Sequence, residues 1–169
     1  DLAPCYDRVD GFIGVSGQAE GLAHLPDGPF LPPMALNCVE QHVRRRMAEA
    51  FGRTRILTIG RVANLTVRHH GRAPCHYCGP CQRGCVTRSY FSSVNATLPA
   101  AHATGRLTLR PFSIVRSLTA TPDKTRVTGV KVIDARTKLE REYTARVIFL
   151  CASALVSAPS GPRPSSILD

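Results

Sequence analysis

The sequence has no long apolar stretch, because no run approaches the roughly 18 residues that a membrane-spanning helix needs. It also lacks an initiator methionine and the basic start of a signal peptide, since it opens on Asp1-Leu2-Ala3-Pro4. We therefore expect no membrane span, and we expect the first residue to lie inside a longer protein. No internal repeat is evident, which argues against solenoid architectures.

Acidic residues are absent between Ala50 and Pro122, although ten arginines occur there. The basic residues outside this segment equal the acidic ones in number, so the whole net charge of +10 belongs to it. Such a segment can face nucleic acid, an anionic cofactor or an acidic partner surface. Its arginines are scattered and its aromatic residues are few, so we expect no nucleic-acid partner.

Hydrophobic periodicity predicts an α+β chain. The composition is that of an ordinary globular protein, with 43% hydrophobic and 20% charged residues. Apolar residues at helical spacing, with glycine after the last one, predict helices over 2–13, 36–51 and 93–104. Runs of β-branched residues predict strands at 56–59, 64–67, 107–109, 114–119, 127–133, 140–145 and 147–150, with a hairpin turn over 134–138.

Four of the seven cysteines form one run with the spacing C-x2-C-x2-C-x3-C, namely Cys75, Cys78, Cys81 and Cys85. This is the spacing with which bacterial ferredoxins hold iron–sulfur clusters through thiolates. A tight loop is needed because several soft ligands must converge on one point. In ferredoxins the fourth cysteine serves a second cluster and precedes proline, whereas Val86 follows here and no second run exists. Three of the four thiolates would then hold one cluster.

Two other interpretations of the cysteine run stay open. Zinc is the second metal to consider, because C-x2-C is a common half-site and His76 could join it, although zinc half-sites usually lie further apart. The third interpretation is structural, with local disulfides or buried thiols. The isolated cysteines Cys5, Cys38 and Cys151 are expected to be small core residues.

Several stretches of the sequence match the pattern of a known enzyme family. They are Tyr6-Asp7-Arg8-Val9 with Ile13-Gly14-Val15-Ser16-Gly17, Phe30-Leu31-Pro32-Pro33-Met34-Ala35, Pro74 to Cys85, Thr97 to Leu109, and Val127-Thr128-Gly129-Val130 with Ala145 to Ala152. Together they resemble the glucose–methanol–choline oxidoreductases, and within them the bacterial gluconate and sugar dehydrogenase branch. The resemblance extends from Asp1 to about Ser157.

This resemblance implies a central fragment of an FAD-dependent enzyme that oxidises CH–OH groups of alcohols or sugars. In the family, the backbone of one strand residue touches the adenine of FAD, and Val115 matches that position best. A turn at Cys151 and Ala152 would approach the ribose and pyrophosphate, where small residues permit close backbone contact. The family's G-x-G-x-x-G motif and its catalytic histidine have no counterpart here. We therefore assign no catalytic residue and expect the fragment alone to be inactive.

The resemblance also implies a division of the chain and a route for electrons. Residues 1–71 would form a substrate-side segment, 72–93 the cysteine-rich loop, 94–157 part of the FAD-binding domain, and 158–169 a loop or disordered tail. An iron–sulfur cluster in the loop would relay electrons to an acceptor subunit or a cytochrome. The alternatives from other classes are a small iron–sulfur electron-transfer protein and a zinc-binding module.

Overall fold

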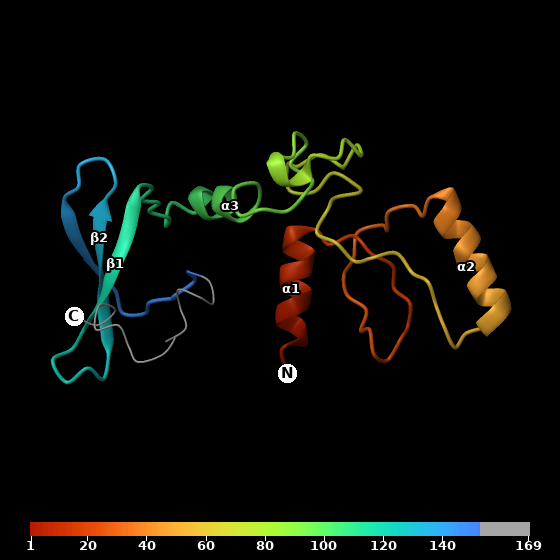
Figure 1. Cartoon of the computed structure of the whole chain (residues 1–169), viewed down its shortest axis with the longest axis horizontal. Coiled ribbons are helices and arrows are strands. Elements are labelled where there is room, and N and C mark those ends of the chain that lie inside the picture. Colours follow the sequence, from red (N-terminus) through yellow and green to blue (C-terminus); the bar gives the residue numbers. More distant parts are fainter. Residues whose placement is uncertain (153–169) are drawn as a thin grey trace. The chain divides into compact units, whose positions relative to one another are not determined.

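The chain divides into two compact units in the computed structural model, which describes residues 1–152 (Figure 1). Unit 1 spans Asp1–Leu107, and unit 2 begins at Thr108. The described residues form three α-helices and a three-stranded antiparallel sheet, which confirms the α+β class. The sequence-based boundaries at 71/72 and 93/94 both fall inside unit 1, and the tail over 158–169 lies outside the described residues.

The structure confirms the first two helices that the apolar spacing predicted. Helix α1 spans Ala3–Ile13 and ends at Gly14, whose φ of 79° lies in the left-handed region that favours glycine. Helix α2 spans Cys38–Phe51. Its start is fixed by a capping box, in which the Asn37 side chain accepts from the N–H of Glu40 and the Glu40 carboxylate accepts from the N–H of Asn37. This cap explains why the helix begins after residue 36.

The third helix, α3, covers Thr97–Ala103 and is shorter than the predicted 93–104. Pro99 accounts for the difference at the amino end. Proline has no backbone N–H and is tolerated only in the first turn of an α-helix. A helix that began at Ser93 would place Pro99 in its interior, so the chain forms turns before Thr97 instead.

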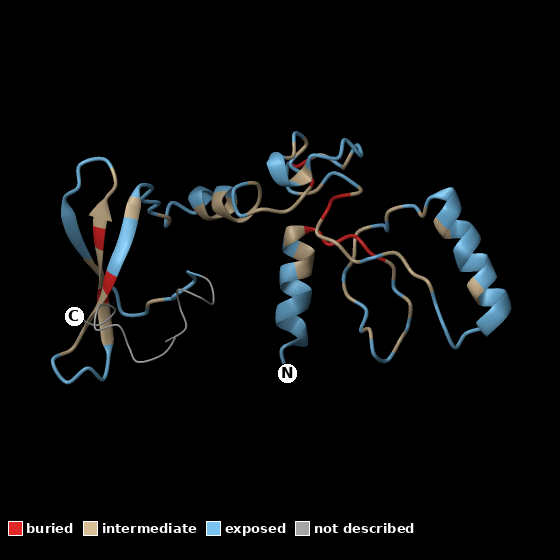
Figure 2. Ribbon diagram, viewed as in Figure 1, coloured by how far each residue is buried: buried red, intermediate tan, exposed pale blue. Residues whose placement is uncertain are grey.

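Loop-to-loop backbone hydrogen bonds hold the buried part of unit 1 together. The buried residue Ser16 exchanges two of them with Val62, at N···O distances of 2.9 and 3.1 Å. Leu65, which is completely buried, donates its N–H to the carbonyl of Ser89. Figure 2 shows that the buried parts of unit 1 lie in these connecting segments and outside the helices.

The strands predicted at 56–59, 64–67 and 107–109 are wrong. The stretches 56–59 and 107–109 have no ladder partner in the described structure, and Asn64 forms only an isolated bridge with Tyr90. A strand requires a neighbouring strand with which to exchange hydrogen bonds. In unit 1 the neighbouring segments meet at single residues, so the β propensity is not converted into a sheet.

The helices of unit 1 leave their apolar faces open. Within residues 1–152, no side chain of α1, α2 or α3 is buried, and the buried aliphatic residues are Val15, Leu65 and Val132. Tyr6 on α1 is 67% exposed and Val39 on α2 is 66% exposed. None of the helices in this range combines the length and the apolar character that crossing a bilayer requires.

Unit 2 contains an antiparallel meander (Figure 1). Its strands are β1 (Ser113–Ala120), β2 (Val127–Asp134) and β3 (Glu140–Thr144), in the order β1-β2-β3. They confirm the strands predicted at 114–119, 127–133 and 140–145. The strand predicted at 147–150 is absent from the described residues, because no further strand lies beside β3 to pair with it.

The register of the sheet places β1 at an open edge. Val115 pairs with Val132, and Val132 pairs in turn with Arg141 of β3. Arg116 is an extra residue in β1, because Val115 pairs with Val132 and Ser117 already pairs with the adjacent Lys131. Such a bulge bends and twists the strand that carries it. On the turn side, the predicted hairpin over 134–138 is confirmed by the register between β2 and β3.

Candidate functional site

The cysteine run lies in a loop whose two stems are pinned at the buried centre of unit 1. The N–H of Cys75 donates to the carbonyl of Leu65 at 2.8 Å, and the N–H of Ala73 donates to the carbonyl of Thr87 at 3.2 Å. Because Leu65 is completely buried, Cys75 is tied to the most enclosed point of the unit. Between the stems, the short 3-10 helix Cys81–Arg83 turns the chain back.

Cys85 has the most specific surroundings of the four thiols. Its Sγ lies 3.3 Å from Ser89 Oγ and 3.4 Å from Thr87 Oγ1. Burial raises the pKa of the Cys85 thiol, but hydrogen bonds from Ser89, Thr87 and the N–H of Tyr90 outweigh burial and lower this pKa from 9.0 to about 6. Donors aimed at the sulfur favour the thiolate, which is the form that binds metals and reacts with electrophiles.

The four cysteines share a loop but do not converge on a common point. Within residues 1–152, no group of three or more cysteine, histidine, aspartate or glutamate side chains is arranged to hold a metal ion. All seven cysteines are free thiols, so no local disulfide forms in the run. Cys78 is exposed, whereas Cys75, Cys81 and Cys85 are half-buried. A cluster or zinc ion would require the loop to adopt another arrangement.

The isolated cysteines do not pack in a core. Cys5, Cys38 and Cys151 are all exposed, contrary to the expectation from their apolar neighbours in the sequence. Cys5 and Cys38 lie on α1 and α2, where the apolar faces of the helices remain open. Exposure of these thiols therefore follows from the missing cover over the two helices.

Val115, the residue expected to face adenine, lies on the edge strand β1 and is 56% exposed. An edge strand presents N–H and C=O groups on its free side that no neighbouring strand satisfies. Cys151 and Ala152, the other two expected cofactor residues, are exposed as well and follow β3 by several residues. All three belong to unit 2, whereas the cysteine run belongs to unit 1.

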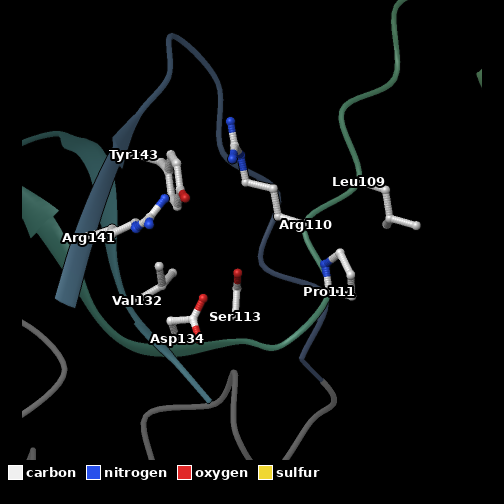
Figure 3. A pocket seen from close by; sticks show the side chains of 8 residues that line it. All are labelled: Leu109, Arg110, Pro111, Ser113, Val132, Asp134, Arg141 and Tyr143. Carbon is white, nitrogen blue, oxygen red and sulfur yellow. The ribbon is translucent and has the colours of Figure 1, made fainter. Parts of the chain in front are cut away.

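A small pocket of about 240 Å³ opens on one face of the unit 2 sheet (Figure 3). Its lining combines two arginines with two hydroxyl groups over a buried valine, and the residues are Leu109, Arg110, Pro111, Ser113, Val132, Asp134, Arg141 and Tyr143. The guanidinium carbon of Arg110 lies 4.8 Å from the ring centre of Tyr143. We call this hollow the Arg110–Arg141 pocket.

Asp134 brings one negative charge to the Arg110–Arg141 pocket. Its Oδ1 accepts hydrogen bonds from the backbone N–H groups of Thr137 and Arg136, each at 2.9 Å. These bonds, together with the positive charge of Arg141, hold the pKa of the Asp134 carboxyl below its ordinary value. Asp134 is therefore an ionised turn residue whose Oδ1 is already engaged by the hairpin.

With this geometry described, the chain was compared with known proteins. No family model matches it. A search of curated proteins gives no match of significance either. The resemblance to the glucose–methanol–choline family therefore stays an expectation from the sequence.

Two features of these sites were missed by the sequence analysis. Thr87 and Ser89 follow Cys85 at the second and fourth positions, but hydroxyl residues are common in loops and their spacing alone does not signal a sulfur contact.

Arg72 is 4% exposed and donates from Nη2 to the carbonyl of Ile13 at 2.5 Å. It therefore satisfies a carbonyl at the end of α1. A buried arginine has no distinguishing sequence signal here, since arginines are scattered throughout the segment.

Proposed function

We propose that this chain forms part of an FAD-dependent oxidoreductase that acts on CH–OH groups of alcohols or sugars. The observation that carries the proposal is the position of Val115 on the open edge strand β1, beside the bulge at Arg116. This is where the family resemblance expects backbone contact with adenine. The exposed residues Cys151 and Ala152 belong to the same unit and leave their backbone accessible.

An open strand edge suits the adenine ring for a chemical reason. Adenine carries a hydrogen-bond donor next to an acceptor along one side, which is the pattern that a strand offers to its neighbour. The free side of β1 can therefore pair with adenine as it would with another strand. The bulge at Arg116 interrupts regular pairing and disfavours the addition of a further strand at that point.

The uncovered helices favour an assembly larger than the described residues. Val39, Val43 and Phe51 all lie on α2 and are 39% to 66% exposed. Soluble proteins rarely leave a contiguous apolar face open. We propose that other parts of the enzyme cover the apolar faces of α1 and α2.

The roles of this chain in the proposed reaction are binding and positioning. When bound, FAD would supply the acceptor for the hydride of the CH–OH group. This chain holds the adenine end through β1 and leaves room for the ribose and pyrophosphate at Ala152. It carries neither G-x-G-x-x-G nor a counterpart of the catalytic histidine, so it has no activity alone.

The cysteine run is given no step in this proposal, because its thiols do not converge in the structure. An iron–sulfur cluster on Cys75, Cys78, Cys81 and Cys85 stays a prediction, as do its zinc alternative and an acceptor subunit or cytochrome. Anaerobic purification followed by iron, sulfide, zinc and flavin analysis decides between them. A brown protein with equimolar iron and sulfide would support the cluster, and a colourless metal-free protein would exclude it.

Adenosine is the probe that tests the adenine contact, since it carries the ring and the ribose without phosphate. In amide NMR spectra of the full chain, we expect saturable shifts at Val115, Cys151 and Ala152. Ala152→Trp fills the space beside the ribose and should weaken binding about tenfold or more, which is the loss of roughly one good contact. Ala103→Trp, at an exposed alanine of α3, is the matched control and should bind as the wild type does. Shifts outside unit 2, or equal losses in both variants, would refute the proposal.

A further inference from the structure

We propose that the Arg110–Arg141 pocket of unit 2 is a binding site for a phosphate group, with the guanidinium groups of Arg110 and Arg141 and the hydroxyls of Ser113 and Tyr143 as its donors. The site lies wholly within unit 2. It needs neither a flavin nor a metal, so it stands or falls independently of the proposed oxidoreductase.

The two guanidinium groups are available for a ligand. Within residues 1–152, neither Arg110 nor Arg141 is in an ion pair or donates a side-chain hydrogen bond; the ion pairs there join Arg46 to Glu49, Arg61 to Asp27 and Arg116 to Glu140. A guanidinium carries five N–H donors in a fixed plane, a geometry that matches the oxygens of phosphate. Together the two guanidinium groups have more N–H donors than the Asp134 carboxylate of the lining can accept.

The sheet brings these donors to one face. Arg141 projects from β3 and pairs in register with Val132, the buried residue at the base of the pocket. Arg110 precedes β1, and its guanidinium carbon lies 4.8 Å from the ring centre of Tyr143, within the range of a cation–π contact. Figure 3 shows the Ser113 hydroxyl pointing from β1 into the space between the two arginines. The Tyr143 ring therefore positions Arg110 before the ligand arrives, whereas the exposed Arg141 is positioned through its backbone in β3.

The charge of the lining favours an anion. Asp134 is the single carboxylate of the pocket, and its Oδ1 is engaged by the backbone of the hairpin. Arg141 offsets that charge, and Arg110 leaves the lining with a net positive charge. The acidic residues of β3, Glu140 and Glu142, pair with Ile133 and Lys131 and alternate with Arg141 along the strand, so they point to the opposite face of the sheet.

The size of the pocket selects a small group. Its volume of about 240 Å³ is below the roughly 300–1,000 Å³ of sites that enclose drug-sized ligands. A tetrahedral phosphate fits such a hollow and presents oxygens in several directions, toward donors on β1, on β3 and on the segment before β1. A flat aromatic ligand would compete with Arg110 for the face of Tyr143.

The test is a titration of the full chain with inorganic phosphate, followed by amide NMR at mildly alkaline pH, where phosphate is a dianion. Chloride at equal ionic strength is the control. We expect saturable shifts at Ser113, Arg141 and Tyr143 with phosphate and none with chloride. Arg141→Gln removes one charged donor pair and should weaken binding about tenfold or more.

Two further variants keep the test decisive. Arg116→Gln removes an arginine of the same sheet that is paired with Glu140, and it should leave phosphate binding unchanged. Tyr143→Phe removes one hydroxyl but keeps the ring under Arg110, so it should weaken binding a few-fold without disturbing the sheet. Shifts that fail to saturate, or an equal loss in Arg116→Gln and Arg141→Gln, would overturn the proposed site.

Discussion

Replacing Gly14 with alanine is the sharpest test of how unit 1 is held together. Gly14 follows α1 with a φ of 79°, and its neighbourhood is crowded. A Cβ added there would overlap Leu65 Cδ2 and would approach His69 Cδ2 within 2.9 Å. Leu65 is completely buried, and its backbone carbonyl accepts the hydrogen bond from the N–H of Cys75 in the loop stem, so its side chain has little space to move.

The expected loss of stability has two parts. A non-glycine residue in the left-handed region costs roughly 1–2 kcal/mol. Forcing an extra methyl group against a packed side chain costs typically about 1–3 kcal/mol. Gly14→Ala should therefore destabilise unit 1 by about 2–5 kcal/mol. Since whole domains are stable by only about 5–15 kcal/mol, this is a large share of the total.

Gly71→Ala separates the two parts of that loss. Gly71 has a nearly identical φ of 75°, but a Cβ there would have no atom within 4 Å. This control should lose only the backbone share, about 1–2 kcal/mol. The assay is urea unfolding of the full chain, followed by far-ultraviolet circular dichroism and fitted with a common slope. Equal losses in the two variants would refute the packing of Leu65 against Gly14.

Three further predictions concern single groups. In metal-free protein, the rate of Cys85 alkylation by iodoacetamide should rise with pH, with the midpoint of this rise at about pH 6. Ser89→Ala should move this midpoint to higher pH. A midpoint at pH 9.0 in the unaltered protein would contradict the hydrogen bonds to the Cys85 sulfur. Asp134 has a lowered pKa in the folded chain, so its stabilising effect is present above its unfolded pKa of about 3.9 and is lost as the pH falls through the lower folded value. The amide signal of Thr137 should report that titration, and Asp134→Asn should abolish it, whereas an unshifted titration would count against the turn. Asn37→Ala should cost about 1 kcal/mol and lower helical ellipticity, while an unchanged spectrum would argue against the capping box of α2.

Elements that depend on local signals were predictable from the sequence. The apolar spacing within α1 and α2 and the glycine after each helix are local signals, so they can be read without knowing any distant partner. The meander of unit 2 was predictable for a similar reason, because its three strands follow one another and the turn after β2 carries Asp134, whose side chain caps the turn backbone. The α+β class follows from these elements.

Features that depend on distant partners were not predictable. The stretch at 56–59 is rich in β-branched residues, but its strand character is unused because no neighbouring strand is available in unit 1. The burial of Arg72 beside the end of α1 and the hydroxyl contacts of Cys85 arise only when the stems of the loop are pinned. The spacing of the four cysteines, in turn, predicted convergence, but spacing alone does not close a loop around a point.

The pocket on the sheet also lay beyond the reach of the sequence. Arg110 and Arg141 are separated by two strands and a hairpin, and they meet only because β3 returns beside β2 in the observed register. An arginine that precedes a predicted strand has many other places to point. The pairing of Val132 with Arg141 is what brings the second guanidinium over the same face.

Fluorescence anisotropy with FAD and riboflavin tests most directly whether unit 2 receives the adenine end of FAD. Riboflavin carries the isoalloxazine ring but lacks the adenosine and both phosphates. We predict that the full chain raises the anisotropy of FAD saturably, that adenosine competes for this binding, and that riboflavin shows no response. Equal binding of riboflavin, or FAD binding that adenosine fails to displace, would contradict it.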